Sequence, residues 1–188
     1  MKDKKMDLDN AAYEVFSEYG YKNTNISEIA KKAGMAVGSF YKYYQSKEEI
    51  FLETYIKENE RVRKQLIDKV HWNGEPVDVI DELFTYTLES VLKNKILAEW
   101  NNPTISEVLH KYYYSEAGTS NYTFHQFLLN IFQERLNQEK YGPELTSKLL
   151  KVYDLIYYID CHITEKDFEN YSETLRILVK YFIKGVFS

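Results

Sequence analysis

Apolar residues recur three or four positions apart along almost the entire chain, and this spacing is the strongest constraint on its fold. In residues 7–19, for example, the apolar side chains would form one stripe along a helix. No segment shows the strict alternation that is typical of a half-buried strand. Only 7 glycines and 3 prolines occur in 188 residues, which is too few for a fold built from many tight turns. The sequence therefore predicts an all-α protein.

The breaks between the apolar stripes predict about nine helices, three short ones followed by six others. Their approximate ranges are 7–19, 25–33, 36–44, 47–70, 77–100, 104–114, 122–140, 144–162 and 165–187. Gly20 stands where a glycine commonly ends a helix. Asn25 and Glu28 have the spacing of a capping box, as do Thr164 and Asp167.

Positive charge is concentrated near the N-terminus, although the whole chain has a net charge of −5. Residues 20–47 contain five lysines and a single acidic residue, Glu28. The acidic remainder argues against nucleic-acid binding over the whole surface. A local basic segment is compatible with a small nucleic-acid interface, or with chance clustering of lysines.

The second and third predicted helices have features that a helix-turn-helix motif requires. A short turn beginning at Gly34 joins them, and small residues open the third helix, which allows close approach to a DNA groove. Phe40 and Tyr44 are four residues apart and are expected to face inward. The alternative is an ordinary three-helix packing. The candidate DNA contacts are Asn25, Ala36, Val37, Gly38, Ser39, Tyr41, Lys42, Tyr43 and Lys47.

Residues 8–50 resemble the N-terminal domain of the TetR family of bacterial transcriptional repressors. That domain typically reads Ile-x-x-Ala-Ala-x-x-x-Phe-x-x-x-Gly-Tyr, then Thr-Thr-x-x-x-Ile-Ala-x-x-Ala-Gly-Val-Ser-x-Gly-x-Leu-Tyr-x-Tyr-Phe-x-x-Lys-Glu-x-Leu. The matching residues here are Leu8, Ala11, Ala12, Phe16, Gly20, Tyr21, Thr24, Ile29, Ala30, Ala33, Gly34, Gly38, Tyr41, Tyr43, Lys47, Glu48 and Ile50. The resemblance adds Thr24 to the candidate DNA contacts. It implies a DNA-binding domain over 1–46 and a ligand-binding and dimerisation domain over 47–188.

Several residues depart from what is usual in the family, and four of these departures bear on the expected function. Asn25 replaces the second threonine and can still cap a helix. Asp9 stands where an apolar residue is common, so the first helix is expected to pack less tightly. Ala36 replaces serine, which removes a side-chain cap from the third helix. Val37 is apolar where polar residues are frequent, and it either meets a thymine methyl group or simply reaches solvent.

The resemblance also implies a mode of action. Two copies would pair through residues 144–187 and would bind a palindromic operator on double-stranded DNA. The alternative for these apolar helices is that they only close the core of their own subunit. Binding of a small apolar or aromatic effector would release the repressor from DNA. The helix at 47–70 would transmit the conformational change from the effector site to the DNA-binding domain. The expected effector contacts are Phe84, Trp100, Tyr113, Phe124, Phe127, Tyr153, Tyr157 and Cys161.

Other function classes receive little support from the sequence. No nucleophile–base pair, metal-binding motif or phosphate-binding glycine loop indicates an enzyme, and no cofactor or metal is expected. Cys161 beside His162 could suggest metal or redox sensing, but a single thiol argues against this. A helical module that binds only protein is the other alternative. No membrane-spanning run and no signal peptide occur, so a cytoplasmic protein is expected.

Overall fold

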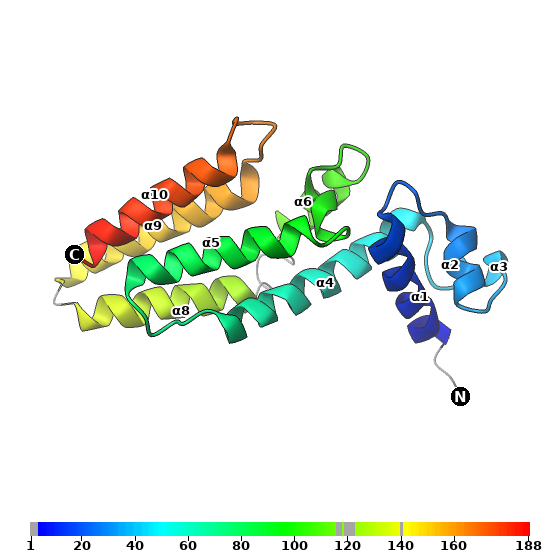
Figure 1. Cartoon of the computed structure of the whole chain (residues 1–188), viewed down its shortest axis with the longest axis horizontal. Helices are drawn as coiled ribbons and strands as arrows, with labels where there is room; N and C mark the ends of the chain where they lie inside the picture. Colours follow the sequence, from blue (N-terminus) through cyan, green and yellow to red (C-terminus); the bar gives the residue numbers. More distant parts are fainter. Residues whose placement is uncertain (1–3, 116–117, 119–122, 140) are drawn as a thin grey trace. The chain divides into compact units, whose positions relative to one another are not determined.

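The computed structural model of the chain describes residues 4–115, 118, 123–139 and 141–188. Within these residues the regular elements are helices and no strand is present, so the all-α prediction is confirmed (Figure 1). Residues 122 and 140, the predicted ends of one helix, lie outside the described residues. The elements are α1 (Lys4–Tyr19), α2 (Ile26–Lys32), α3 (Val37–Phe40), α4 (Lys47–Lys69), α5 (Pro76–Leu92), the 3-10 helix η1 (Leu97–Asn101), α6 (Ser106–Tyr113), α8 (Thr123–Gln138), α9 (Pro143–His162) and α10 (Tyr171–Val186).

The chain packs into two compact units. Unit 1 comprises residues 1–63 and 89–111, and unit 2 comprises residues 64–88 and 112–188. Helices α4 and α5 each contribute residues to both units. These units are defined by packing, whereas the predicted division after residue 46 is a division by function. That division stays a prediction.

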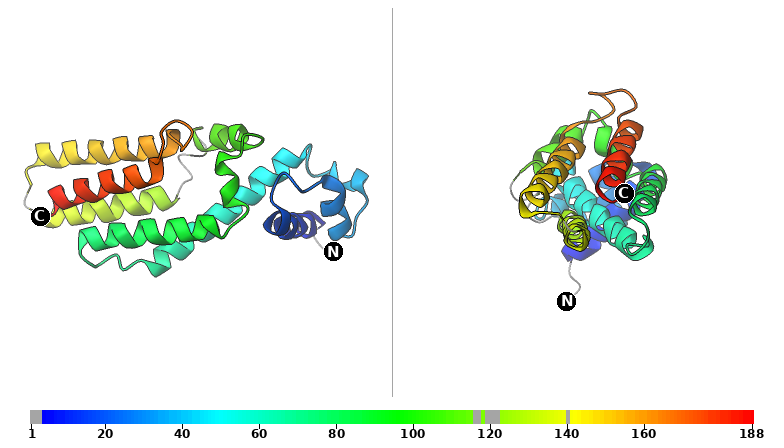
Figure 2. Two further views of the ribbon diagram at one scale, coloured as in Figure 1. Left: turned by 45° about the horizontal axis from the view of Figure 1, so that its top comes forward. Right: turned by 90° about the vertical axis from the view of Figure 1, so that its left-hand side faces the viewer.

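In unit 1, the apolar stripe of α1 is buried as its spacing predicts. Leu8, Ala12 and Phe16 each have 0 % of their surface exposed. The ring of Phe16 contacts the edge of the Phe51 ring, with centroids 4.8 Å apart, and the Tyr21 ring lies 4.9 Å from Phe51. Aromatic pairs at such distances add to the stabilisation that burial supplies. Helices α1, α2 and α3 thereby group around the beginning of α4 (Figures 1 and 2).

Gly20 ends α1, as its position predicts. Its φ of +74° is in the left-handed region, which glycine adopts without steric cost. A Cβ atom at this position would lie 2.9 Å from Oε1 of Glu99, so a side chain would also collide with its surroundings. The same oxygen accepts a hydrogen bond of 2.8 Å from the backbone N–H of Tyr21. The left-handed conformation therefore favours glycine here, and a side chain would also displace the Glu99 carboxylate from its hydrogen bond with Tyr21.

The predicted helix over 77–100 is wrong in its last third. Helix α5 ends at Leu92, and after a turn the chain forms the separate 3-10 helix η1. Asn94 causes the break, because its side-chain oxygen accepts hydrogen bonds from the backbone N–H groups of Ile96 and Leu97. An asparagine side chain that caps backbone donors in this way competes with a continuous helix.

In unit 2, helices α8, α9 and α10 run side by side (Figures 1 and 2). Their shared core contains Phe132 and Leu136 of α8 together with Ile183 and Val186 of α10. Partly buried residues of α9, including Tyr153, pack against this core. One face of these helices therefore stabilises unit 2 itself.

The final helix begins later than predicted. Residues 164–167 form a turn, in which the Asp167 carboxylate accepts hydrogen bonds from the backbone N–H and the hydroxyl of Thr164. Asn170 then adopts a left-handed conformation with φ of 56°, and α10 starts at Tyr171. The Glu165 carboxylate accepts the backbone N–H of Tyr171. The Thr164–Asp167 pair thus closes a turn rather than opening the helix.

Candidate nucleic-acid interface

Helix α2 begins with the capping box that its sequence predicts. The side-chain oxygen of Asn25 accepts the backbone N–H of Glu28 at 3.0 Å, and the Glu28 carboxylate accepts the backbone N–H of Asn25 at 3.1 Å. These bonds satisfy polar groups that a helix end otherwise leaves without partners. The first turn of α2 is therefore held in place before anything binds to it.

The turn between α2 and α3 is closed by Gly34. Its φ of +68° lies in the left-handed region, and Met35 donates its backbone N–H to the carbonyl of Ala30 at 3.0 Å. This pattern is typical of a glycine that ends a helix. Ala36 follows as the N-cap of α3 without a side-chain hydrogen bond, as its replacement of serine predicts.

Helix α3 has an inner and an outer face, and the residues divide between them as predicted. Phe40 and Tyr44 are 0 % and 1 % exposed, whereas Val37 and Tyr41 are 41 % and 55 % exposed. Lys42 is also exposed. The regular helix ends at Phe40, and hydrogen-bonded turns extend the same course to Tyr44. Small and exposed side chains therefore occupy the outer surface of this segment.

Two predicted DNA contacts already make internal hydrogen bonds. Thr24 is 2 % exposed, and its hydroxyl donates to the carbonyl of Gly20 at 2.8 Å. The Lys47 ammonium donates to the carbonyls of Tyr21 and Thr24 at 3.0 and 2.9 Å. Both side chains hold the segment between α1 and α2 in position. A phosphate contact by the Thr24 hydroxyl would require this side chain to leave the interior.

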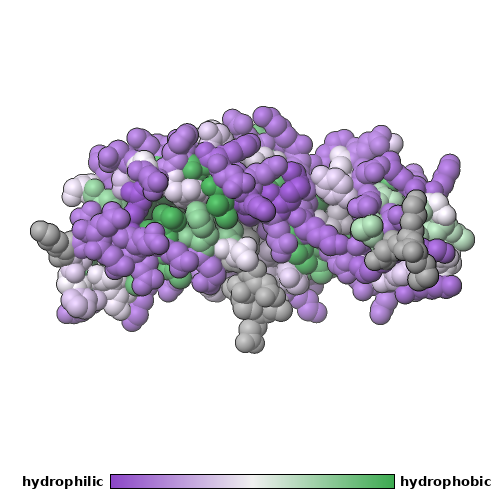
Figure 3. All heavy atoms as spheres, turned by 90° about the horizontal axis from the view of Figure 1, so that it is seen from below, coloured by the Kyte–Doolittle hydropathy of each residue, from purple (hydrophilic) through white to green (hydrophobic). Residues whose placement is uncertain are grey.

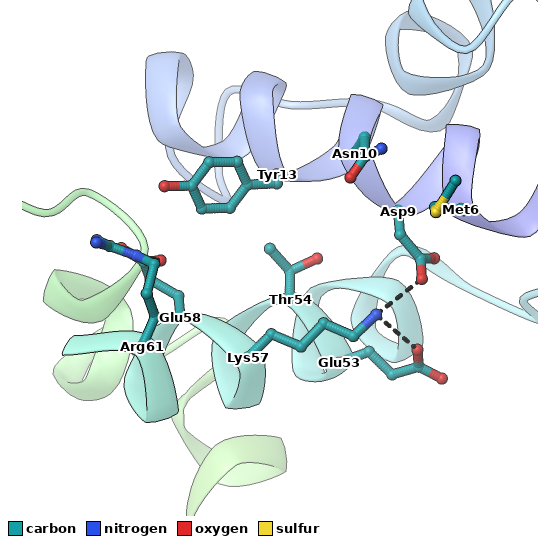
Figure 4. A pocket seen from close by; sticks show the side chains of 9 residues that line it. All are labelled: Met6, Asp9, Asn10, Tyr13, Glu53, Thr54, Lys57, Glu58 and Arg61. Carbon is teal, nitrogen blue, oxygen red and sulfur yellow. Dashed lines mark hydrogen bonds and ion pairs between the residues drawn. The ribbon is translucent and has the colours of Figure 1, made fainter. Parts of the chain in front are cut away.

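A polar groove of about 260 Å³ lies between α1 and α4. Figure 4 shows the Lys57 ammonium between the carboxylates of Asp9 and Glu53, at 2.7 and 3.8 Å. Elsewhere in the groove the buried carboxylate of Glu58 accepts two hydrogen bonds from Arg61. The charged groups of the groove thus pair with one another across α1 and α4.

The hydroxyl of Tyr44 joins the turns that follow α3 to this charged cluster. It lies 2.5 Å from Oδ1 of Asp9 and 2.8 Å from Oε2 of Glu53, and it accepts a hydrogen bond of 2.7 Å from the Lys5 ammonium. Burial, together with these two carboxylates, raises the pKa of Tyr44, so its hydroxyl stays protonated. Tyr44 stands where the family pattern has phenylalanine, and the hydroxyl meets Asp9, the other unusual polar residue.

Asp9 does not loosen α1 as expected, because the cluster supplies partners for its carboxylate. Burial by itself would raise the pKa of Asp9, but hydrogen bonds from Lys57 and Tyr44 and two nearby ammonium groups lower it below 3.8. The neighbouring Leu8 is fully buried. This cluster could not be predicted from the sequence because its members are far apart in the chain, although the unusual Asp9 was a signal of it.

We expect Asp9→Asn to reduce the free energy of unfolding at pH 7 by about 2 kcal/mol, which is typical of a lost hydrogen bond to a charged group. The folded-state pKa of Asp9 is lowered, so its contribution is complete above pH 3.8 and is lost as the pH falls through the folded value. The difference between wild type and variant should therefore shrink at low pH. Denaturant unfolding at pH 7 and at pH 3 measures both quantities.

Glu14→Gln is the matched control, because Glu14 is also on α1 but pairs with Lys32 at an exposed position. Its effect should be below about 0.5 kcal/mol at both pH values. An Asp9→Asn variant with the same loss of stability at pH 7 and pH 3 would contradict the role of the carboxylate charge.

The predicted effector contacts are distributed over both units. Trp100 belongs to unit 1, where it stacks on Tyr55 with ring centroids 6.1 Å apart. In unit 2, the His125 ring stacks on Tyr157 at 3.6 Å and lies 5.6 Å from the Tyr153 ring. Burial lowers the pKa of His125, which favours the neutral ring between these tyrosines.

The remaining predicted effector contacts also lie in unit 2. Phe127 packs edge-on against Trp72 at 4.9 Å, and Phe124 is 5 % exposed. Tyr113 contacts Tyr112 edge-on. Phe84 and half-buried Cys161 complete the set. Within the part of the chain that the structure describes, no group of three or more histidine, cysteine or acidic side chains is placed to hold a metal ion.

Comparison with known proteins supports the resemblance noted for the N-terminal segment. Residues 10–54 match the model of bacterial regulatory proteins of the tetR family. The chain is 37 % identical over 83 residues to the uncharacterized HTH-type transcriptional regulator YdgC of Bacillus subtilis. This alignment spans 44 % of the chain and 43 % of the relative, so the chain covers less than half of that protein.

Solved structures share the fold over almost the whole chain. The fatty acid degradation regulator FadR of Bacillus halodurans superimposes with a TM-score of 0.54 at 19 % identity, over 100 % of this chain and 96 % of FadR. FadR of Thermus thermophilus, a TetR-family repressor in complex with lauroyl-CoA, also has a TM-score of 0.54, at 18 % identity and over 97 % and 92 % of the two chains. These similarities establish the arrangement of the helices.

Proposed function

We propose that this chain, whose residues 10–54 match the model of bacterial regulatory proteins of the tetR family, is such a regulator and binds double-stranded operator DNA through α2 and α3. The observation that carries the proposal is the outer surface of α3, which a complete capping box and a glycine turn hold in position. The N-terminal residues of α3 would face base edges in the major groove. The other proposed DNA contacts are Asn25, Ala36, Gly38, Ser39 and Tyr43. Lys47 is proposed to contact a phosphate while it keeps its hydrogen bonds to the carbonyls of Tyr21 and Thr24.

We propose that two copies pair through α9 and α10 and present their α3 segments to a palindromic operator. Both helices expose large apolar side chains. They are Leu145, Val152, Leu155 and Tyr158 on α9, and Ile177, Leu178 and Tyr181 on α10. No residue of α9 is fully buried within the subunit. Figure 3, in which the molecule is seen from below, shows further apolar surface on the part that holds unit 2, on a side other than that of α10. Exposed apolar surface of this extent is typical of an interface.

We propose repression that a small apolar or aromatic effector relieves by binding among the aromatic side chains of unit 2. Effector and operator would each favour a different spacing of the two DNA-binding segments, and a coupling of about 1–3 kcal/mol would change DNA affinity about 5- to 150-fold. Helix α4 is continuous from Lys47 to Lys69 and has residues in both units, so it is suited to transmit a conformational change from one unit to the other. Lauroyl-CoA is a practical first probe for release from DNA.

The test of DNA binding is a gel-shift titration of the full chain against DNA that flanks its own gene, with a scrambled duplex of equal length as competitor. A regulator of a bacterial operator works in the cytoplasm, so the titration uses about 0.15 M salt. A selective shift that weakens with added salt supports the proposal. An enzyme or a protein-binding module would give no selective shift, and that result would overturn the proposal.

Lys42→Ala should weaken binding to every duplex to a similar degree and should lower the slope of log Kd against log salt by about one unit per half-site. Lys42 is exposed beside α3, where its charge would meet a phosphate. Fluorescence anisotropy at several salt concentrations measures the slope. Lys93→Ala removes an exposed lysine at the end of α5 and is the control. An unchanged slope in Lys42→Ala would remove Lys42 from the interface.

A further inference from the structure

The outer face of α3 carries an apolar pair. Val37 and Tyr41 are four residues apart, so they lie on the same side of the helical segment. Their exposed fractions are 41 % and 55 %, while Phe40 and Tyr44 on the inner side are almost fully buried. Val37 is the first residue of α3. An apolar side chain therefore stands in the first turn of α3, the part that would reach deepest into a groove.

The surroundings of Val37 leave it unobstructed. A Cβ atom built on Gly38 would meet no other atom within 4 Å, so the surface beside Val37 is open. Ala36, on the other side, is exposed and makes no side-chain hydrogen bond. A flat DNA surface could thus approach the valine isopropyl group without displacing another side chain.

The chemistry of this face limits how it can recognise bases. Among the side chains that commonly make specific hydrogen bonds to base edges, residues 36–43 lack arginine, asparagine, glutamine and acidic groups, and their one lysine, Lys42, is proposed to contact a phosphate. Thymine is the base that presents a methyl group in the major groove. A valine pressed against guanine, cytosine or adenine would instead cover polar atoms and leave them without hydrogen bonds, which is costly.

We propose that Val37 is a specificity-determining residue whose isopropyl group contacts the C5-methyl group of one thymine in each operator half-site. This inference rests on the proposed DNA-binding function and adds the base that the operator must contain. It also separates the two expectations for Val37 that the sequence left open. Tyr41 lies on the same face and flanks the contact, with its hydroxyl available to the adjacent backbone.

The experiment removes the methyl group from the DNA and the isopropyl group from the protein, separately and together. The operator duplex is first obtained by selecting a random duplex library on the full-length protein. Each thymine is then replaced by deoxyuridine, which lacks only the C5-methyl group, and Kd is measured by fluorescence anisotropy. At one thymine per half-site we expect a loss of about fourfold per methyl group, or about 16-fold with both half-sites changed.

Val37→Ala should weaken binding to the thymine duplex by a similar factor and should show no further loss when that thymine is replaced. Leu92→Ala shortens an exposed leucine outside the proposed interface and is the control. Its affinity for DNA should fall on the deoxyuridine duplex by the same factor as that of wild type. Circular dichroism verifies that each variant is helical. Because the deoxyuridine duplexes probe the unmodified protein, the inference remains testable even if Val37→Ala is unstable.

Two results would overturn the inference while leaving the proposed function intact. One is selective binding that no deoxyuridine substitution weakens. The other is a Val37→Ala variant that loses as much affinity on the deoxyuridine duplex as wild type does. A library that yields no preferred sequence would instead overturn the proposed function, and this inference with it.

Discussion

Leu155→Glu is expected to convert the proposed dimer into monomers and to abolish selective DNA binding at nanomolar concentrations. Leu155 lies on α9 and is 56 % exposed, three residues from the exposed Val152 and Tyr158 on the same helix. In a twofold interface the substitution would bury one carboxylate per subunit without a partner, which costs several kcal/mol per charge. The Kd of the dimer should therefore rise by at least about 1000-fold.

Sedimentation velocity over a range of concentrations measures this change, and anisotropy on the same samples measures DNA affinity. Leu92→Glu introduces the same charge at a leucine that is 75 % exposed on α5, and it should leave both quantities unchanged. Circular dichroism must show that Leu155→Glu is folded. A folded variant that sediments as wild type does would show that α9 and α10 only close the core of one subunit.

Phe51→Ala should remove about 3–5 kcal/mol from the free energy of unfolding of unit 1, the usual cost of such a cavity. Phe51 is 0 % exposed and contacts Phe16, Tyr21 and Tyr55 through its ring. This loss is a large share of the about 5–15 kcal/mol that stabilises a typical domain. DNA binding at 37 °C should fall in proportion to the folded fraction of unit 1.

The two tryptophans allow this loss to be assigned to one unit. Trp100 stacks on Tyr55 in unit 1, and Trp72 packs against Phe127 in unit 2. Urea unfolding in a Trp72→Phe background therefore follows Trp100 alone. Phe168→Ala is the control, because Phe168 belongs to unit 2 and is 53 % exposed. If Phe51→Ala shifted the Trp100 transition no more than this control does, the aromatic cluster would not stabilise unit 1.

Helix positions and caps were largely readable because they depend on neighbours in the chain. The apolar stripe of α1, the capping box of Asn25 and Glu28, and the terminating Gly20 all follow from residues within a few positions of one another. The two wrong boundaries have a related cause. Asn94 and Glu165 each accept hydrogen bonds from backbone N–H groups further along the chain, and the residue type alone does not say which N–H groups a side chain will cap.

The roles of individual polar side chains in the candidate interface were less predictable. Lys47 matched the family pattern and was predicted to contact a phosphate, but its ammonium also donates hydrogen bonds to the carbonyls of Tyr21 and Thr24. Asp9 was expected to weaken packing, but Lys57, which is 48 residues away, neutralises it. A residue's type shows which bonds it can make, while its partners depend on which distant segments meet.

By itself, the sequence determined the all-α class, the capped helix-turn-helix segment and the inward direction of Phe40 and Tyr44, because helical periodicity and capping act over a few residues. Only the tertiary structure decided that Asp9, Tyr44 and Glu53 form one cluster with the lysines around them, and that Lys47 donates hydrogen bonds to the carbonyls of Tyr21 and Thr24. These outcomes depend on contacts between helices far apart in the chain, where burial and charge neutralisation set the free energy of each side-chain position.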